Sequence, residues 1–367
     1  MWRPLAAIPQ LFTFNHQTKT NGSSQQSQPQ PQPQPKPSVL VVGYGWGSHA
    51  FLQKLDTTKY AVQVVSEREG RLNQPSMISS LHATYTAPPP SLHYVRDTCV
   101  SLDAAGSAVR GASGARYSYD YLVISVGSEA NDFRIPGVRD NCMMCKTGED
   151  IAAIRALSEK ESHATIFGAG PTGLELACRL HAAGLEVAVY EAADTILPGF
   201  SEAFKKKAAR QLCAMGITVH LGTPIVAVGA DAIQTKDGVS HPCSSFKVWT
   251  CGIQPVGFAR GLGSAGVDDR LAWNGYTNVF GLGDCIRRPP PTAQNAVQQG
   301  HFLAELFNSD FAKGGGAQGA QGGQGTQETN GYRFRELGRA LDMTEGVLVE
   351  IWGIVLYFPY FRHEPLI

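Results

Sequence analysis

Short continuous apolar runs, each followed by glycine and then by a helical pattern, recur along the chain. In the first, Val39–Val42 stops at Gly43, a helical pattern continues through Leu55, and a second apolar run, Ala61–Val65, ends beside Glu67. Continuous apolar runs are typical of strands that are buried on both faces, as in a parallel sheet. The stretch is therefore predicted to form a strand, a helix and a second strand parallel to the first.

The loop between the first strand and its helix has the glycine spacing of a dinucleotide-binding turn. Gly43 permits a tight turn, and Gly45 allows a pyrophosphate to approach the main chain at the positively polarised helix N-terminus. Ser48 takes the third glycine position, where a small residue still permits close packing of helix and strand. Glu67 follows about 20 residues on, where an acid binds the ribose. The alternative is a glycine turn in a sheet that binds no nucleotide.

A second stretch repeats this pattern with all three glycines. The apolar run Ala164–Phe167 leads into Gly168, Gly170 and Gly173, a helical pattern follows, and Glu191 ends the next predicted strand about 20 residues on. Two complete patterns in one chain make a protein without nucleotide improbable. Glu191 is expected to accept hydrogen bonds from an adenine ribose and to repel a 2′-phosphate, which favours NADH over NADPH. Its alternative role is that of a solvated carboxylate at a strand end.

The composition of the chain restricts the number of domains and the kinds of partner that are expected. A length of 367 residues exceeds that of most single domains, so two domains with tails are expected. Lys and Arg together equal Asp and Glu at 31 each, and without a basic excess nucleic acid is not expected as a partner. Eight scattered cysteines form no metal-ligand pattern, so no metal is expected and the thiols are expected to be reduced inside a cell. No apolar run approaches the roughly 20 residues that span a bilayer.

The two ends of the chain and one internal stretch differ in composition from the rest. Residues 1–37 lack Asp and Glu and end in alternating Pro and Gln, which predicts a disordered tail, either an ordinary one or an organelle transit peptide. Residues 312–331 are rich in Gly and Gln, which is typical of a flexible linker. The mainly apolar stretch Val347–Phe361 is too short to span a membrane. A helix lying in a membrane interface and a buried edge element are both compatible with it.

Six segments resemble type II NADH:quinone oxidoreductases, the non-proton-pumping alternative NADH dehydrogenases. They are GYGWGSHAFLQKLDTTKYAVQVVSER, YDYLVISVGSEANDFRIPGV, FGAGPTGLELA, FKVWTCGIQP, NVFGLGDC and PPTAQNAVQQGHFLA. They occur in that family's order and cover most of the chain from Ser38 to Leu306. The glycine patterns alone are common to flavoproteins with two dinucleotide sites, whereas the Gly-Trp pair in the first loop and the PPTAQ segment narrow the resemblance to this family.

The resemblance implies an α/β fold of two Rossmann-like dinucleotide-binding domains, with an NADH domain inserted into an FAD domain and a disordered N-terminal tail. The expected boundaries are 38–147 and 261–311 for the FAD domain, 148–260 for the NADH domain and 332–367 for a C-terminal segment. The implied reaction passes a hydride from NADH to FAD and then two electrons to a quinone. Positioning the nicotinamide against the flavin would be the main contribution of the protein, because that step needs no acid–base pair or metal.

The same resemblance assigns roles to individual residues. Those implied to bind FAD are Gly43, Gly45, Gly47, Glu67, Arg68, Gly127, Asp284 and Ala293. Those implied to bind NADH are Gly168, Gly170, Gly173, Glu191 and Gly252. Glu175 matches a glutamate near the nicotinamide, and Gln294 and Gln298 match a quinone-facing segment, so these three are the implied catalytic residues. A polar face of a surface helix is the alternative for the two glutamines.

Cys142 and Cys145 are separated by two methionines, a spacing that invites comparison with the redox pair of a disulfide reductase. Flavin-dependent disulfide reductases carry their cysteines in the first FAD helix or shortly before the second glycine pattern, and neither spacing fits. We therefore interpret the pair as structural, on a strand that enters the NADH domain.

Two departures from the family keep other functions open. The segment from Pro75 to Leu92 is shorter than the family's, which leaves open whether a helix flanks the flavin, and the C-terminal membrane helices are reduced to a stub. A soluble NADH-dependent flavoprotein reductase with another acceptor, and a degenerate redox-sensing protein that binds FAD or NADH, are the alternatives. The expected setting is the mitochondrion, peripheral at its inner membrane, with plastid and cytosol as alternatives. The expected partners are a quinone, a membrane surface and a second copy in a homodimer.

Overall fold

The computed structural model describes residues 35–263, 266–286, 288, 290–309 and 331–359. All elements named below belong to the unit Lys36–Ile367. The predictions of a tail over residues 1–37 and of a linker over residues 312–331 lie outside the described residues, apart from residues 35–37 and 331.

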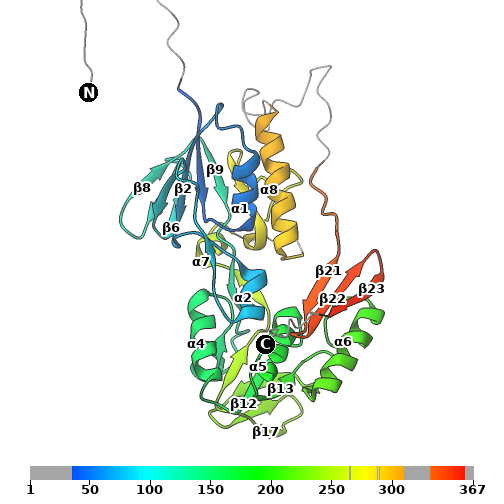
Figure 1. Cartoon of the computed structure of the whole chain (residues 1–367). Helices are drawn as coiled ribbons and strands as arrows, with labels where there is room; N and C mark the ends of the chain where they lie inside the picture. The colour runs from blue at the N-terminus through cyan, green and yellow to red at the C-terminus, as the bar shows by residue number, and fades with distance from the viewer. Residues whose placement is uncertain (1–34, 264–265, 287, 289, 310–330, 360–367) are drawn as a thin grey trace, which may run out of the picture. The chain divides into compact units, whose positions relative to one another are not determined.

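Five parallel strands form the first sheet, in the order β20-β9-β1-β2-β5. Two of them, β2 and β9, are labelled in Figure 1. Their bounds are β1 Ser38–Val42, β2 Ala61–Ser66, β5 His93–Arg96, β9 Tyr121–Ile124 and β20 Val279–Gly281. The predicted β–α–β unit at the start of the chain is present, since β1 and β2 pair in parallel. The strand β20 comes from far along the chain, so the chain leaves the first sheet after β9 and returns to it at β20.

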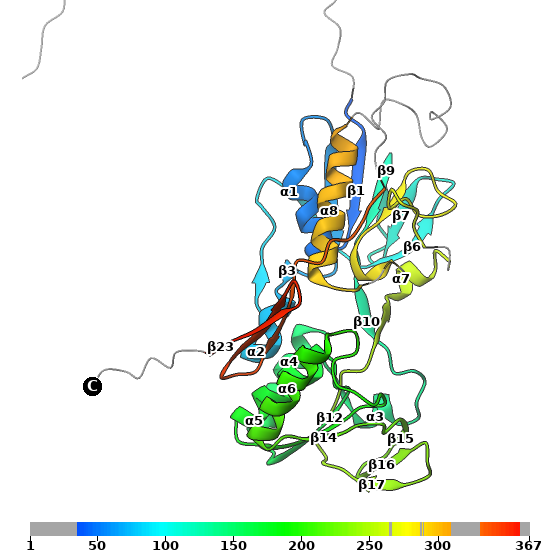
Figure 2. The ribbon, with the colours of Figure 1, turned by 90° about the vertical axis from the view of Figure 1, so that its right-hand side faces the viewer.

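Helices α1 (Trp46–Lys54) and α8 (Ala293–Asn308) lie side by side against this sheet, as Figure 2 shows. Gly300 permits their close approach, because a Cβ at that position would collide with the main-chain oxygen of Gly47. The rings of Phe51 and Phe307 meet edge to face at 5.4 Å between the two helices. Burial of these aromatic side chains helps to hold α8 on the N-terminal β–α–β unit.

A second parallel sheet has the order β11-β18-β12-β13-β14. Its strands β12 and β13 are labelled in Figure 1. Its strands are β11 Met143–Met144, β12 His163–Phe167, β13 Glu186–Tyr190, β14 Thr218–His220 and β18 Lys247–Trp249. Helices α4 (Gly148–Ser158), α5 (Pro171–Ala182) and α6 (Glu202–Met215) accompany it. The second predicted β–α–β unit is therefore also present, as β12, α5 and β13. The interpretation of the segment around Met143 as a strand that enters this domain is confirmed by its pairing with β18.

Two antiparallel strands connect the modules built on the two sheets. They are β10 (Ser128–Ala130), which follows β9, and β19 (Ile253–Pro255), which follows β18. The chain thus leaves the first module along one strand and returns along the other. This topology is the predicted insertion of one Rossmann-like module into another, and the predicted α/β fold class is confirmed.

Short antiparallel strands and helices complete the modules. The strands are β3 Arg71–Leu72, β4 Tyr85–Thr86, β6 Cys99–Asp103, β7 Ala108–Gly111, β8 Arg116–Ser118, β15 Ile225–Val228, β16 Ala232–Thr235 and β17 Ser240–Pro242. The short helices are α2 Gln74–Ser80, α3 Val138–Asn141, α7 Gly257–Arg260 and the 3₁₀ turn η1 Gly283–Cys285. Helix α2 lies in the segment that is short relative to the family, so a short helix is present there.

The C-terminal segment forms a three-stranded antiparallel sheet, β21 (Arg339–Asp342), β22 (Gly346–Ile351) and β23 (Ile354–Pro359). The alternative of an interface helix over Val347–Phe361 is therefore wrong for the described part of that stretch. Trp352 and Gly353, with φ of +51° and +79°, form a two-residue turn that reverses the chain. Among the described residues, no helix has the length and apolar character needed to cross a membrane.

Candidate functional site

The first glycine loop joins β1 to α1 and leaves open space above the helix N-terminus. Gly43 has φ of +89°, and a Cβ there would come within 2.5 Å of the Ser125 carbonyl oxygen. At Gly45, by contrast, the nearest atom to a Cβ would be that same oxygen at 3.8 Å, so the loop is open on this side. The buried Ser48 hydroxyl accepts a hydrogen bond from the Gly45 amide at 2.9 Å, which holds the loop in shape. The loop thus places the N-terminus of α1 at the wall of a cavity.

A cavity of about 950 Å³ begins at this loop and reaches the second glycine helix. Its volume lies in the range of ligand and cofactor pockets. It is lined by ten of the residues singled out from the sequence: Gly43, Gly45, Gly47, Glu67, Arg68, Gly127, Glu175, Asp284, Ala293 and Gln294. These residues come from both modules, and the fold brings them together across more than two hundred positions of sequence.

Asp284 lies on the cavity wall, on the 3₁₀ turn η1 that follows β20. Its carboxylate accepts a hydrogen bond from the Ser128 hydroxyl at 2.9 Å and lies 3.6 Å from the Lys146 ammonium. The amide of Gly283 donates to the side-chain oxygen of Gln299, which is fully buried, at 2.7 Å. Sequence reasoning missed Lys146 and Ser128, because their contact with Asp284 joins positions more than a hundred residues apart.

The acid at the end of β2 is open to solvent. Glu67 is exposed, and its carboxylate lies 3.5 Å from the guanidinium of Arg68, which also lines the cavity. Both side chains lie at the carboxyl end of a parallel strand, the edge at which open α/β sheets bind ligands.

The second glycine loop precedes α5, with Gly170 at the helix N-cap. Glu191 accepts hydrogen bonds from the amides of Ala169 at 2.7 Å and Ala193 at 2.9 Å. It is therefore more than a solvated strand end, because it ties the loop after β12 to the end of β13. Of this loop, Pro171 and Thr172 line the cavity, whereas Gly168, Gly170, Gly173 and Glu191 are not among the described residues of its wall.

Glu175 brings a carboxyl group from α5 to the cavity wall. The Asp342 amide at the end of β21 donates to its Oε1 at 3.2 Å. Burial raises the pKa of Glu175 to about 7; the hydrogen bond from Asp342 opposes this shift and the charge of Asp342 adds to it. Near neutral pH this carboxyl can therefore be present with or without its proton.

The two predicted glutamines contact a segment that follows the linker, residues 332–338, named here the strap. Gln298 binds the main chain of Arg335 at both ends: its Nε2 donates to the Arg335 oxygen at 2.7 Å, and its Oε1 accepts from the Arg335 amide at 3.0 Å. Gln294 Oε1 accepts from the Leu337 amide at 3.1 Å. Gln294 also lines the cavity, whereas Gln298 does not belong to the described wall.

The strap and β21 contribute their own side chains to the cavity wall. Phe334, Glu336 and Arg339 line it, and Arg339 forms an ion pair with Glu336 and donates to the Gly199 oxygen. The guanidinium of Arg339 also lies 4.8 Å from the centre of the Phe200 ring. These residues were missed because the strap lies beyond a low-complexity stretch and carries no local motif.

The surroundings of Gly252 and of the cysteine pair indicate structural roles for these residues. A Cβ on Gly252 would meet the Phe133 ring, and Gly252 is not in the described cavity wall. Cys145 lines the cavity and Cys142 does not; both are free thiols, and burial raises the pKa of each to about 12. Protonated thiols are poor nucleophiles, which supports the structural interpretation. The described residues contain no cluster of His, Cys, Asp and Glu that could hold a metal ion.

Comparison with known proteins defines the class to which this site belongs. Residues 37–300 match the family model described as pyridine nucleotide-disulphide oxidoreductase, and the chain belongs to that family.

Within that family, the resemblance to alternative NADH dehydrogenases is confirmed by curated relatives. The external alternative NAD(P)H-ubiquinone oxidoreductase B3, mitochondrial, of Arabidopsis thaliana is 29% identical over 306 residues, which cover 65% of this chain and 53% of the relative. The external NADH-ubiquinone oxidoreductase 2, mitochondrial, of Saccharomyces cerevisiae is 28% identical over 330 residues, covering 72% and 61%. The chain thus spans about half to three fifths of the length of these relatives.

The fold also matches a solved structure. The structure of NDH2 from Plasmodium falciparum in complex with NADH superposes with a TM-score of 0.76, covers 89% of this chain and 92% of that chain, and is 16% identical. This likeness supports the fold of two Rossmann-like modules.

Proposed function

We propose that this chain is an FAD-dependent oxidoreductase that passes a hydride from NADH to FAD and then two electrons to a quinone. The observation that carries the proposal is the single cavity of about 950 Å³ that both glycine modules share. A reaction between two dinucleotides needs both reacting rings in one enclosed space, held in contact. A protein that only sensed one nucleotide would not need that connection.

The residues around the first loop fit FAD. The open side of Gly45 leaves room for a pyrophosphate at the N-terminus of α1, and Glu67 stands at the strand end where a ribose is bound. Asp284, held by Ser128 and Lys146, would bind the chain between the ribityl group and the pyrophosphate. When bound, FAD supplies the hydride-accepting and electron-transferring chemistry; Gly43, Gly47, Arg68, Gly127 and Ala293 belong to the same proposed site.

The second loop and Glu175 belong to the proposed NADH side of the cavity. Gly168, Gly170 and Gly173 would hold the nucleotide at the N-terminus of α5, with Glu191 near the ribose. Glu191 already accepts two main-chain hydrogen bonds, so it would meet the ribose as a rigidly held carboxylate. Glu175 would hold a proton on its carboxyl group at the cavity wall, where a quinone must gain two protons on reduction. Gly252 is also proposed as an NADH-side residue, because it lies beside the connecting strands β10 and β19.

The quinone side is proposed at Gln294, with Gln298 acting through the strap. Gln294 lies on the cavity wall next to Ala293, and Phe334 adds an apolar surface there. The relatives that carry ubiquinone in their names support this choice of acceptor and a mitochondrial setting. A peripheral position at the inner membrane and a homodimer belong to the same proposal. A soluble reductase of another acceptor is the second candidate.

Anaerobic titration of the purified full chain tests this proposal. The protein is expected to be yellow as isolated, to lose its flavin absorbance on addition of NADH, and to regain it on addition of a short-chain ubiquinone. Reoxidation by a disulfide or a ferredoxin, and not by the quinone, would move the function to the second candidate. Glu191→Gln should lower the NADH/NADPH ratio of reduction rates, because one charge-assisted acceptor is worth about 1.5–3 kcal/mol. A colourless protein that NADH does not change would contradict the proposal.

A further inference from the structure

Three buried polar side chains are linked behind the cavity wall and are named here the buried polar network. Gln299 and Asn295 lie on α8, Tyr332 lies at the start of the strap, and their exposed fractions are 0%, 2% and 5%. Gln299 Nε2 donates to Asn295 Oδ1 at 3.3 Å, and the Tyr332 hydroxyl donates to the same oxygen at 2.5 Å. None of the three belongs to the described wall of the cavity. Because unpaired buried polar groups are costly, a satisfied network of this kind fixes the elements that carry it relative to one another.

One end of the network reaches the turn that carries Asp284. Gln299 Oε1 accepts a hydrogen bond from the Gly283 amide at 2.7 Å, and Gly283 and Asp284 both line the cavity. A main-chain amide can only donate, so it sets the orientation of the Gln299 carboxamide, with its oxygen toward the turn and its nitrogen toward Asn295. The position of the turn is therefore coupled to the position of Asn295.

Asn295 is the branch point of the network. Its Oδ1 accepts the two hydrogen bonds described above, and its Nδ2 donates to the Pro290 oxygen at 2.6 Å and to the Arg288 oxygen at 3.3 Å. Both donor positions and both acceptor positions of this carboxamide are thus used. Pro290 lines the cavity, so Asn295 also holds the segment of the wall that precedes α8.

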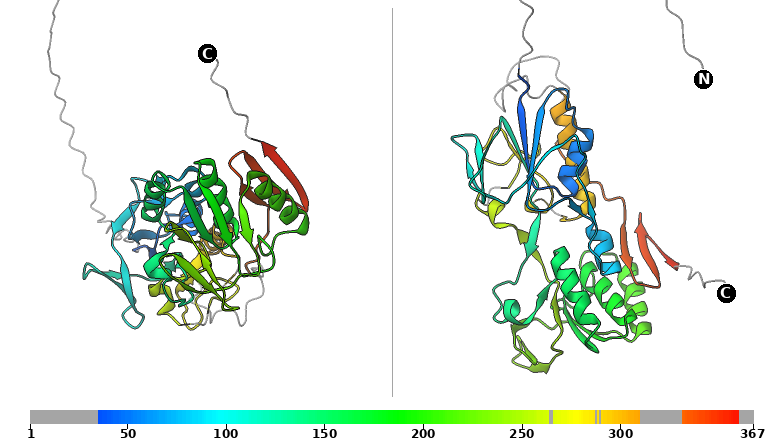
Figure 3. Two further views of the ribbon diagram at one scale, coloured as in Figure 1. Left: turned by 90° about the horizontal axis from the view of Figure 1, so that it is seen from below. Right: turned by 60° about the vertical axis from the view of Figure 1, so that its left-hand side comes forward.

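The other end of the network lies in the strap. The Tyr332 amide donates to the Asp269 oxygen at 2.7 Å, and Arg288 Nη2 donates to the Tyr332 oxygen at 3.1 Å. Burial raises the pKa of Tyr332 to about 12, against the opposing charge of Arg288, so the hydroxyl keeps the proton that it donates to Asn295. From Tyr332 the strap passes beside α8 toward the C-terminal sheet, as the orange and red trace in the right-hand view of Figure 3 shows.

We propose that Gln299, Asn295 and Tyr332 are positioning residues that make the affinity for FAD depend on the strap. They act through the Gly283–Asp284 turn, whose carboxylate Ser128 and Lys146 hold and whose main chain Gln299 holds. This inference rests on the proposed function, because it takes Asp284 as a residue that binds FAD. A network that contributed only to stability would leave the affinity of the folded protein for FAD unchanged.

The dissociation constant of FAD tests this inference without any turnover. The purified full chain is diluted in steps, and the free flavin is measured after ultrafiltration. Gln299→Met keeps the length of the side chain and removes both of its hydrogen bonds, so we expect the dissociation constant to rise at least about tenfold. Tyr332→Phe keeps the buried ring and removes only the hydroxyl, and it should raise the dissociation constant about threefold.

A matched control separates positioning from stability. Leu303 is fully buried on α8, one turn beyond Gln299, in the apolar core of the first module. Leu303→Ala should lower the temperature of unfolding at least as far as Gln299→Met does, because it leaves a cavity in that core. Its dissociation constant for FAD should equal that of the wild type.

The double variant Gln299→Met/Tyr332→Phe shows whether the two residues act along one path. We expect its dissociation constant to equal that of Gln299→Met alone, because the hydroxyl reaches the turn only through Gln299. A dissociation constant raised by the product of the two single effects would overturn the coupling to the strap. Unchanged affinity in Tyr332→Phe would overturn it too, and this variant decides the question even where Gln299→Met does not fold.

The outcome for the wild type distinguishes this inference from the proposed function. A wild type that holds FAD, with variants that hold it equally well, would overturn the role of the buried polar network alone. A wild type that holds no FAD would contradict the proposed function and this inference with it.

Discussion

Gly45 is the residue at which protein stability and cofactor binding are best separated. Its φ of −106° and ψ of −162° are accessible to any residue, and the nearest protein atom to a Cβ is 3.8 Å away. Gly45→Val should therefore fold, while its branched side chain fills the space proposed for the pyrophosphate. We expect the flavin absorbance per mole of purified protein to fall more than about tenfold.

The second glycine loop supplies the matched control for this substitution. A Cβ on Gly170 would meet no atom within 4 Å, so Gly170→Val is tolerated by the protein in the same way. This variant should keep its flavin and lose reduction by NADH. A Gly45→Val protein with normal flavin content would show that the first loop does not bind FAD.

Glu175 links the cavity to pH-dependent stability. Its carboxyl titrates near 4.5 in the unfolded chain and near 7 in the folded protein, where burial disfavours the charge. Between these pH values the folded state retains a proton that the unfolded chain has lost, so the free energy of unfolding falls as pH rises from about 4.5 to about 7. Above pH 7 the buried carboxylate is charged, and its full cost lowers the free energy of unfolding by an amount on the order of 3 kcal/mol.

Glu175→Gln should remove this cost and still accept the hydrogen bond from Asp342. We expect urea unfolding to give a gain in stability at pH 8 that exceeds the gain at pH 5 by about 2 kcal/mol. Glu159→Gln replaces an exposed carboxylate with 66% of its side chain open to solvent and should show no such difference. Equal gains for Glu175→Gln at both pH values would contradict burial as the cause.

At the scale of elements, α8 and the strap act as one unit. Gln298 makes two hydrogen bonds to the main chain of Arg335, and Gln294 makes one to Leu337. Each of these hydrogen bonds contributes about 1 kcal/mol, net of the lost contact with water, to stability. Gln298 is therefore a positioning residue that holds the strap in place. Through the strap it also positions Phe334 and Glu336 on the cavity wall.

Gln298→Ala should release the strap locally. We expect hydrogen exchange of the Arg335 amide to become about tenfold faster, since the loss of its acceptor lowers the cost of local opening. Glu305→Ala, on the same helix, removes an exposed ion pair with Lys54 and should leave that exchange rate unchanged. Unchanged exchange in Gln298→Ala would mean that other contacts hold the strap.

Elements whose signals are local could be predicted from the sequence, and those set by distant contacts could not. Both β–α–β units were predictable, because a strand, a glycine turn and a helix follow one another within about 30 residues. The pairing of Gln298 with Arg335 spans 37 positions and a low-complexity stretch, so no pattern indicated it. The C-terminal hairpin was ambiguous because its turn, Trp352-Gly353, has an aromatic residue where Asn is usual.

The residues of the candidate site fall into the same two groups, those with a local signal in the sequence and those set by distant contacts. The glycine patterns and the resemblance together indicated ten residues that line the cavity. Those at strand ends meet there because the carboxyl ends of parallel strands lie at one edge of a sheet. Lys146, Ser128 and the strap residues depend on how the modules pack, which motifs do not encode. The choice of Gln298 as a quinone-facing residue followed the resemblance to the family, and its side chain binds the main chain of the strap.

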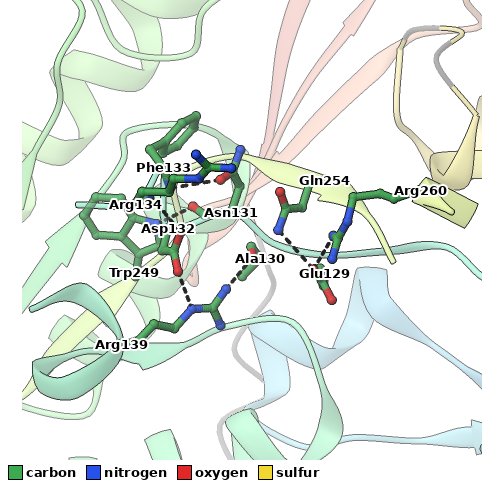
Figure 4. A network of polar contacts seen from close by, with 10 residues as sticks. All are labelled: Glu129, Ala130, Asn131, Asp132, Phe133, Arg134, Arg139, Trp249, Gln254 and Arg260. Carbon is green, nitrogen blue, oxygen red and sulfur yellow. Dashed lines mark hydrogen bonds and ion pairs between the residues drawn. The ribbon is translucent and has the colours of Figure 1, made fainter. Parts of the chain in front are cut away.

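At the scale of the whole described unit, the two modules are joined by β10 and β19 and a set of side chains around them (Figure 4). Glu129 on β10 accepts hydrogen bonds from Gln254 on β19 at 3.0 Å and from Arg260 on α7. On the other side, the Trp249 indole donates to the Asn131 oxygen at 2.9 Å. These contacts hold the paired strands β10 and β19 together, and these strands join the two modules that share the cavity.

Glu129→Ala should therefore affect the alignment of the two modules more than the free energy of unfolding. Its ion pair with Arg260 is 40–45% exposed, so its loss should change the free energy of unfolding by no more than about 1 kcal/mol. Small misplacements of reacting groups reduce rates strongly, and we expect flavin reduction at saturating NADH to slow about tenfold while the NADH concentration for half-saturation stays unchanged. Asp103→Ala removes a comparably exposed pair with Arg116 in the β6–β8 sheet and serves as the control, with both quantities unchanged. Stopped-flow reduction separates the two quantities. A raised half-saturation concentration at an unchanged limiting rate would show that Glu129 contributes to NADH binding and not to the alignment of the modules.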